Sequence, residues 1–266
     1  MNSTDVNPTD TTDDRPLLVT EHGAVMVMTI NRPHARNAID LGLATALAEA
    51  TTELDARPDL RVGVLTGSAG VFSAGMDLKA FAAGQTPTVP GRGFGGLVEA
   101  EVATPLIAAI EGYALGGGLE LALACDLVVT ARDARLGLPE VTRGLVAGAG
   151  GVFRLPRRIP RALALQMMLT GEPIDGARAA ELGLAVEATE PGQSLEAALD
   201  LAERIATSAP LALAAVTRIL RETEGLSDAE AFAVQRPIIA SLKDSADAAE
   251  GARAFAEKRP PQWTGR

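Results

Sequence analysis

The sequence predicts an α/β fold in which a core of strands and helices is followed by a C-terminal region of helices. The first observation behind this prediction is a set of nearly continuous apolar runs, such as residues 61–67 and 126–131, typical of buried strands in a parallel sheet. Helical patterns separate these runs, as in other α/β cores. After the glycine-rich stretch at 148–151 helical patterns dominate. With 266 residues, 47% of them hydrophobic, the chain can bury a sizeable core.

The N-terminal part of the chain predicts a tail, a strand pair and a helix. Residues 1–15 are polar and acidic, which predicts a disordered tail. Apolar runs at 17–20 and 24–30, on either side of a turn with glycine, predict two paired strands. Asp40 is then expected to cap an alanine- and leucine-rich helix that extends to about Ala56.

The middle of the chain alternates between strand and helix patterns. The expected elements are a strand at 61–67, a loop at 84–96, a helix at 97–103, a strand at 105–111, a helix from 116 and a strand at 126–131. The loop at 84–96 is rich in glycine and proline, so we expect it outside the core, either as a lid over a ligand or as a plain surface loop. Its segment Gly91–Gly96 matches the dinucleotide pattern G-x-G-x-x-G. No strand precedes that segment, so we reject a nucleotide site there.

The C-terminal part is expected to be helical, and prolines follow its last helix. Its predicted elements are helices at 161–170, 176–182, 194–207, 210–222, 228–242 and 246–258, and a short strand near 183–188. The predicted organisation is therefore a tail at 1–15, a catalytic core at 16–195 and a helical region at 196–266.

Composition excludes several classes of function. The net charge of −10 and the lack of a basic block argue against nucleic acid as a partner. The single cysteine, Cys125, rules out an intrachain disulfide, and His22 and His34 are too few for a multi-histidine metal site. We also expect no serine–histidine triad, no metal and no membrane span. Since no signal peptide is evident, the sequence predicts a cytoplasmic protein.

Three consecutive glycines at 116–118 open a predicted helix and are followed by Glu120. Glycine lets a ligand approach the backbone closely, and the first N–H groups of a helix have no partner inside it. Such a terminus suits a developing negative charge. The glycines alone are also compatible with close helix–strand packing. A carboxylate in an otherwise apolar helix is harder to explain by packing, so we favour a functional role for Glu120.

Two further segments carry candidate groups. Glu140 follows Leu138 and Pro139, and taken alone it is better explained as a surface acid; together with the glycines and Glu120 we favour a functional role for it. The turn at 73–77, Ser-Ala-Gly-Met-Asp, leaves a strand and can aim a backbone N–H into a cleft, although taken alone an ordinary strand–helix turn explains it better. An anion-stabilising backbone beside two carboxylates can form an enolate and move protons around it.

With these segments identified, the chain resembles the crotonase (enoyl-CoA hydratase/isomerase) family from about residue 17 to 266. The motifs that carry the resemblance lie at 72–79, 107–126, 137–140, 148–156, 169–174 and 254–259. The stretches at 93–98 and 257–266 also resemble the carnitinyl-CoA dehydratase branch, which is a weaker signal. The resemblance implies a spiral core of ββα turns, a C-terminal helical trimerisation region and a homotrimer or hexamer.

The resemblance also implies an acyl-CoA substrate and no further cofactor, because coenzyme A is part of the substrate. It places the oxyanion hole at the backbone N–H groups of Met76 and Gly117, and it makes Glu120 and Glu140 the acid/base pair. Glu140 is then the proton donor to C2, and Glu120 holds and deprotonates the water. The residues expected to contact the substrate or CoA are Arg36, Ala74, Met76, Asp77, Leu78, Lys79, Gly116, Gly117 and Lys258.

The function predicted from the resemblance is hydration of a 2-trans-enoyl-CoA, or the reverse dehydration. Three alternatives stay open: dehydration of carnitinyl-CoA, isomerisation of a 3-enoyl-CoA, and a non-catalytic acyl-CoA-binding paralogue. One glutamate can suffice for isomerisation, and the presence of both glutamates favours hydration over the non-catalytic paralogue.

Overall fold

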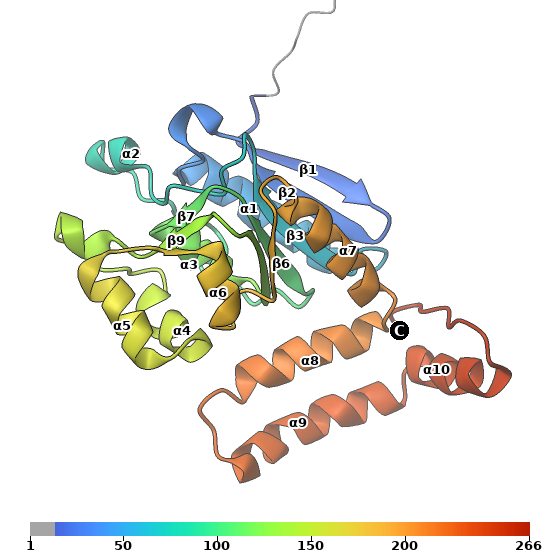
Figure 1. Ribbon diagram of the computed structural model, residues 1–266. Coiled ribbons are helices and arrows are strands. Elements are labelled where there is room, and N and C mark those ends of the chain that lie inside the picture. Colours follow the sequence, from blue (N-terminus) through green and yellow to red (C-terminus); the bar gives the residue numbers. More distant parts are fainter. Residues whose placement is uncertain (1–13) are drawn as a thin grey trace, which may run out of the picture.

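The computed structural model describes residues 14–266, which form an α/β core and, at the C-terminal end, a lobe of helices (Figure 1). The α/β fold class and the C-terminal helices predicted from the sequence are confirmed. Asp14 and Arg15 have no regular secondary structure, and the rest of the predicted tail lies outside the described residues. None of the described helices is long and apolar enough to cross a membrane.

The main sheet of the core has six strands. In the order in which they pair, they are β1 (Leu17–His22), β2 (Val25–Ile30), β3 (Val62–Gly67), β6 (Leu106–Ile110), β8 (Leu127–Ala131) and β11 (Glu187–Thr189). β1 pairs antiparallel with β2, as the strand-pair prediction requires. Each of the remaining pairs is parallel, which places β3, β6 and β8 in the buried centre of the sheet.

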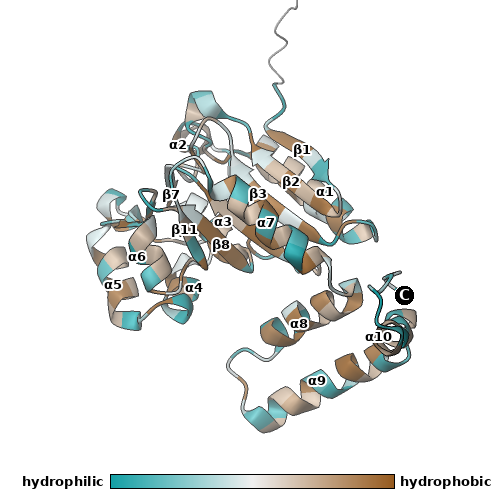
Figure 2. Ribbon diagram, turned by 45° about the vertical axis from the view of Figure 1, so that its right-hand side comes forward, coloured by the Kyte–Doolittle hydropathy of each residue, from teal (hydrophilic) through white to brown (hydrophobic). Residues whose placement is uncertain are grey.

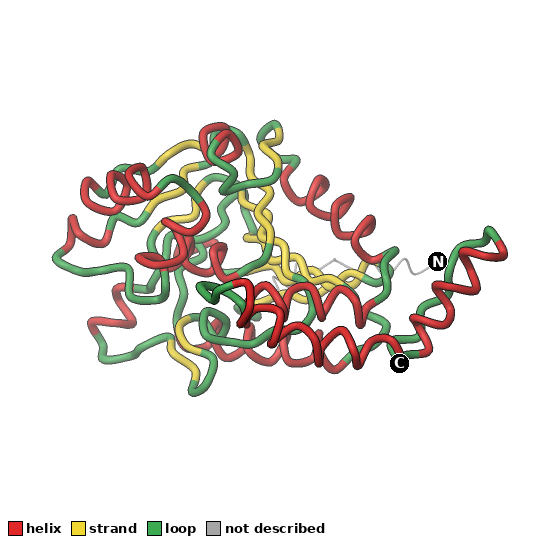
Figure 3. Tube along the Cα trace, turned by 90° about the horizontal axis from the view of Figure 1, so that it is seen from below, coloured by secondary structure: helices red, strands yellow, loops and turns green. Residues whose placement is uncertain are grey.

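Helices cover both faces of the main sheet (Figure 3). Alternate side chains of a strand point to opposite faces. Met28 therefore packs on one face with helix α1 (Leu41–Ala56), while its neighbour Val27 packs on the other with helix α7 (Ser194–Ala206). Asp40 caps α1 by accepting a hydrogen bond from the Leu43 N–H at 2.9 Å, as predicted.

A second, smaller sheet forms another layer of the core. Its strands pair in the order β10 (Ile174–Asp175), β9 (Arg135–Gly137) and β7 (Tyr113–Leu115). β7 and β9 are parallel, with Leu115 beside Gly137. Single bridges extend this layer: Ser73 pairs with Ala114, and Met76 pairs with Ile39. The predicted turn at 73–77 is thus held against the strand that leads into the glycine-rich helix.

The other helices flank this layer or form the C-terminal lobe. Those of the core are η1 (Pro33–Ala35), α2 (Leu78–Ala82), α3 (Gly117–Ala124), η2 (Glu140–Arg143), α4 (Gly151–Arg158), α5 (Arg161–Thr170) and α6 (Gly176–Glu181). The lobe contains α8 (Pro210–Glu222), α9 (Asp228–Lys243) and α10 (Ala246–Glu257). The lobe stands away from the sheet (Figures 1 and 2). α8 meets the core where the Arg221 guanidinium donates to the Val102 carbonyl at 3.0 Å.

The predicted helix at 97–103 is wrong, because this segment consists of turns and backbone without regular secondary structure. Its backbone groups are bound by side chains from elsewhere in the fold. The carbonyls of Val98 and Val102 accept from Arg154 and Arg221, and the Ala103 N–H donates to Asp55 at 3.0 Å. Tertiary partners thus replace the hydrogen bonds that a helix would provide.

The loop at 84–96 is also better packed than the sequence suggests. It contains a two-stranded hairpin, β4 (Thr88–Val89) and β5 (Gly93–Phe94), and Gly96 is buried against α1. A methyl group on Gly96 would lie 2.0 Å from the Ala44 carbonyl oxygen. The expectation that this whole loop lies outside the core is therefore wrong for its second half.

Three other differences have local causes. The strand predicted near 183–188 begins only at Glu187, because Leu184 and Ala185 are apolar residues buried in a bend. α4 was not predicted, since glycines precede it and Pro156 lies inside it. β7, β9 and β10 have two or three residues each, too short for a period-two pattern.

Candidate active site

Two backbone N–H groups lie side by side where the turn at 73–77 meets the start of α3. Met76 is bridged to Ile39 through the Ile39 N–H and the Asp77 N–H, which leaves the Met76 N–H unused. Gly117 is the first residue of α3, so its N–H has no partner within the helix. Among the described residues, neither N–H takes part in a hydrogen bond.

Glycines make this close approach feasible. Gly75 has φ of 93°, and a methyl group there would lie 2.7 Å from the Leu115 carbonyl oxygen and 3.1 Å from the Gly117 nitrogen. A methyl group on Gly117 would lie 2.4 Å from Cζ of Phe94. A side chain at either position would therefore force these segments apart.

Glu120 lies in the first turn of α3 and is 3% exposed. Its Oε1 atom accepts two backbone hydrogen bonds, from the Ala149 N–H at 2.7 Å and the Gly151 N–H at 2.9 Å. Both donors belong to the glycine-rich turn that leads into α4. These bonds fix the carboxyl group and favour its charged form.

Glu140 begins η2 and approaches the N-terminus of α3 from the other side. A methyl group on Gly116 would lie 3.1 Å from its Oε1 atom. Its Oε2 atom is buried and has no hydrogen-bond partner in the structure. An unpartnered buried carboxyl oxygen is costly, which marks this group as a candidate for chemistry.

The two carboxyl groups have raised pKa values. Burial is the main cause of the raised pKa of Glu120, and the negative charge of Glu140 adds to it. The N–H donors of Gly151 and Ala149 and the charge of Arg154 oppose this rise. Burial also raises the pKa of Glu140, opposed by its own backbone N–H and by Arg143. Carboxyl groups with raised pKa values keep a proton more readily than ordinary carboxylates, which suits acid/base chemistry.

Most of the other predicted contact residues lie around the Met76 turn. The Ala74 N–H donates to the Arg36 carbonyl at 3.1 Å, and the side chains of Arg36, Leu78 and Lys79 are exposed there. Asp77 is already engaged, because it caps α2 and its other oxygen lies 3.0 Å from an Arg32 nitrogen. Asp77 therefore supports the turn rather than presenting a free carboxylate.

Lys258 does not join this group within one chain. It follows α10 in the C-terminal lobe, whereas α2 with Lys79 lies at the opposite end of the molecule (Figure 1). Among the described residues, no cluster of three or more histidine, cysteine or acidic side chains could hold a metal ion.

The sequence reasoning missed three contributors to the site. Ala149 and Gly151 donate to Glu120, and Phe94 lies over Gly117. Both segments were visible as glycine-rich stretches, at 148–151 and 93–96, although no local pattern shows what their backbone groups face.

Known proteins are similar to this chain over nearly its whole length. The model of the enoyl-CoA hydratase/isomerase family matches residues 20–266. Carnitinyl-CoA dehydratase of Salmonella typhi is 41% identical over 259 residues, which cover 94% of this chain and 98% of that protein.

Solved structures are also similar to this chain over nearly its whole length. The enoyl-CoA hydratase EchA1 from Mycobacterium marinum superposes with a TM-score of 0.93 at 52% identity, covering 95% of this chain and all (100%) of that one. A carnitinyl-CoA hydratase from Mycobacterium avium has a TM-score of 0.76 at 44% identity, covering 95% of this chain and 99% of that one.

Proposed function

The chain belongs to the enoyl-CoA hydratase/isomerase (crotonase) family, and from this premise we propose that it adds water to a 2-trans-enoyl-CoA or removes it from the 3-hydroxyacyl-CoA. The observation that carries the proposal is the placement of the Glu140 carboxyl group, whose Oε2 atom is buried without a partner while its Oε1 atom lies beside Gly116. It faces the end of α3 that also bears Glu120 and the Gly117 N–H. Family membership alone would leave hydration and isomerisation equally open.

In this proposal the thioester oxygen lies between the N–H groups of Met76 and Gly117. Attack of water at C3 places negative charge on that oxygen, and the two donors stabilise the resulting enolate. Donors that are already oriented need no rearrangement when the charge forms. Because backbone groups serve, the side chain at position 76 is free to be a methionine.

The hydrogen bonds support a division of the acid and base roles between the two glutamates. Glu120 accepts two N–H bonds, which favour its carboxylate, so it holds the attacking water and takes its proton. Glu140 has an oxygen without a partner and a pKa raised by burial, so it delivers a proton to C2. The C2–C3 π bond breaks as the C3–O and C2–H bonds form, the proton lost by water goes to Glu120, and the proton gained by C2 comes from Glu140.

The assay that tests the proposal follows the absorbance of the enoyl thioester with crotonyl-CoA as substrate. Hydration removes this absorbance. Activity only with a 3-enoyl-CoA would indicate isomerisation, and binding without turnover would indicate a non-catalytic paralogue. A carnitinyl or crotonobetainyl thioester belongs in the same panel, because relatives at 41% and 44% identity are named for carnitinyl-CoA.

Charge reversal at the turn is expected to weaken CoA binding. We propose that Arg36 and Lys79 face the CoA phosphates, so Arg36→Glu and Lys79→Glu should raise KM and largely spare kcat. Both side chains are exposed, and salt screens such charges over roughly 8–10 Å, so the effect should shrink at high ionic strength. Lys243→Glu, at the end of α9, is the matched control.

A truncated substrate separates the phosphate role from a structural one. With a pantetheine thioester, which lacks the nucleotide, the Lys79→Glu variant should match the wild type. An equal rise in KM for both substrates would contradict the phosphate assignment. Lys258→Glu should show the same pattern only in an oligomer, because Lys258 ends α10, which lies far from α2 within one chain (Figure 1).

The C-terminal region, 196–266, is proposed to form a homotrimer or hexamer. Its helices contain many hydrophobic residues (Figure 2). Several of these are 40–88% exposed, namely Val216, Leu220, Phe232, Ile239 and Phe255. Exposed apolar area of this kind marks interaction surfaces. Light scattering should give a mass of three or six 27.4 kDa chains, and Leu220→Asp with Phe255→Asp should lower it. A stable monomer at micromolar concentration would contradict the proposal.

A further inference from the structure

We propose that Arg154, on α4, is a positioning residue for the hydration reaction, because it ties the turn that holds Glu120 to the segment that covers Gly117. The inference rests on the proposed function, and it concerns a side chain that need not touch the substrate. Arg154 connects the two segments through two hydrogen bonds, one from each terminal nitrogen of its guanidinium group.

The first bond supports Glu120. Nη1 of Arg154 donates to the Ala149 carbonyl at 3.2 Å. The N–H of the same residue, Ala149, and that of Gly151 donate to Glu120 Oε1. Movement of this turn would therefore move both donors relative to the carboxylate.

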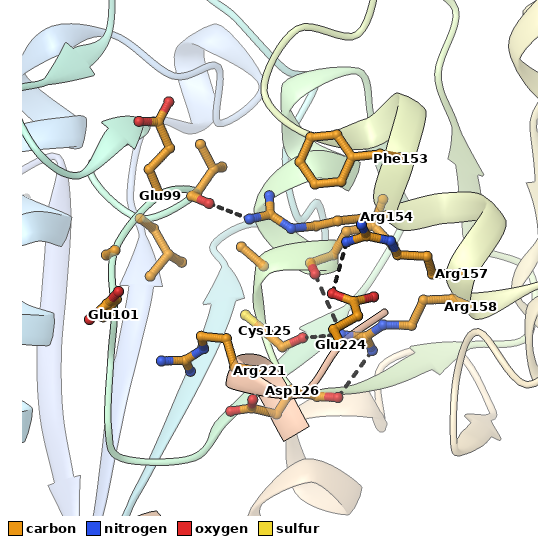
Figure 4. A pocket seen from close by; sticks show the side chains of 15 residues that line it. Glu99, Glu101, Cys125, Asp126, Phe153, Arg154, Arg157, Arg158, Arg221 and Glu224 are labelled. Carbon is orange, nitrogen blue, oxygen red and sulfur yellow. Dashed lines mark hydrogen bonds and ion pairs between the residues drawn. The ribbon is translucent and has the colours of Figure 1, made fainter. Parts of the chain in front are cut away.

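The second bond reaches the other half of the site. Nη2 of Arg154 donates to the Val98 carbonyl (Figure 4). Val98 ends the stretch from Gly93 that is buried except for Phe94, which is half-buried and whose ring lies over Gly117. The predicted helix at 97–103 would have used the Val98 carbonyl internally, so its absence makes this bond available.

The other arginines of α4 have different partners. All three line a cavity of about 360 Å³ between α3, α4 and α8 (Figure 4). Arg157 forms an ion pair with Glu224 at 2.8 Å. Arg158 donates to the Asp126 and Cys125 carbonyls at 3.0 and 2.7 Å. Of the three, Arg154 is the one bonded to the turn that holds Glu120.

Gly150 shows how closely the guanidinium fits this turn. Its φ is 103°, and a methyl group there would lie 2.3 Å from Nη1 of Arg154. The Gly150 carbonyl also accepts from the Arg154 N–H at 2.9 Å. Backbone and side chain of Arg154 thus hold the turn together, and glycine leaves space for the guanidinium.

Arg154 also acts on Glu120 by its charge. The charged groups that act on Glu120 are Glu140, from η2, which raises its pKa, and Arg154, from α4, which lowers it. Removing Arg154 should raise the pKa of Glu120 further. Because the base must be ionised, the acid limb of the pH–activity profile should then lie at a higher pH than in the wild type.

The test compares Arg154→Met, Arg154→Lys and the control Arg157→Met. Methionine keeps length without charge or donors, whereas lysine keeps the charge but not the paired donors. Both Arg154 variants should lose roughly 10- to 100-fold in kcat, since a misplacement of about 1 Å can cost on the order of 100-fold. The acid limb of the pH profile should move up in Arg154→Met and stay near the wild type in Arg154→Lys. Arg157→Met should resemble the wild type, because its ion pair is exposed.

Hydrogen exchange provides a readout that does not depend on turnover. The amides of Ala149 and Gly151 should exchange faster than in the wild type in both Arg154 variants. Their exchange rates should be unchanged in Arg157→Met. Wild-type exchange and an unmoved acid limb in Arg154→Met would overturn the positioning role. If Arg154→Met does not fold, the same exchange measurement on Arg154→Lys tests the positioning role. Wild-type turnover in Glu120→Gln would instead overturn the proposed function itself, which keeps the two failures distinct.

Discussion

Replacing Glu140 by glutamine is expected to lower kcat by roughly 100- to 10,000-fold, the range typical for removal of a general acid or base. Glutamine has nearly the same shape but cannot donate a carboxylic proton. The Glu140 side chain has a buried oxygen without a partner, so the substitution removes no hydrogen bond of that atom. Stopped-flow or steady-state measurement of enoyl absorbance gives kcat, and circular dichroism checks the fold.

Glu120→Gln should have a comparable effect, and the double variant should lose less than the product of the two single losses. The two groups act in one addition and influence each other electrostatically, so their effects are not independent. Wild-type-like turnover in Glu140→Gln would remove this residue from the mechanism. Strict multiplication of the two losses would argue against a shared step.

Replacing Gly75 by alanine is expected to lower kcat by about 100- to 1,000-fold, the usual cost of losing one oxyanion-hole donor. The reason is that the added methyl group would press on the Leu115 carbonyl oxygen at 2.7 Å and on the Gly117 nitrogen at 3.1 Å. Both lie next to the N–H groups proposed to bind the enolate. The backbone must shift, since a carbonyl of the adjoining strand cannot rotate away.

Gly70→Ala is the matched control for this variant. Gly70 also has a positive φ, 70°, but a methyl group there would meet nothing within 4 Å. Both variants carry a similar backbone strain, and only Gly75→Ala disturbs the N–H pair. Equal losses of kcat in the two variants would show that strain, rather than the oxyanion donors, explains the result.

Much of the fold could be predicted from the chain alone because its signals are local. An apolar run such as 61–67 indicates a buried strand whatever it pairs with, and Asp40 caps its helix through neighbouring residues. The motifs around Glu120 and Glu140 also indicated the family, which the comparisons confirm.

The helix expected at 97–103 shows where local reasoning fails. Its mixture of apolar residues and glutamates is compatible with a helix. Arg154, Arg221 and Asp55 nevertheless bind its backbone from distant elements. A local pattern contains no information about such partners.

The arrangement of the candidate site was decided by the tertiary structure. The sequence indicated two important glutamates, but it could not show that they approach the same helix end. That approach follows from the parallel pairing of β7 and β9, in which the Gly116 N–H donates to the Gly137 carbonyl at 2.9 Å. This contact places Glu140, three residues after Gly137, beside the start of α3. Strand pairing between distant segments depends on the packing of the whole core, and therefore only the folded chain determines it.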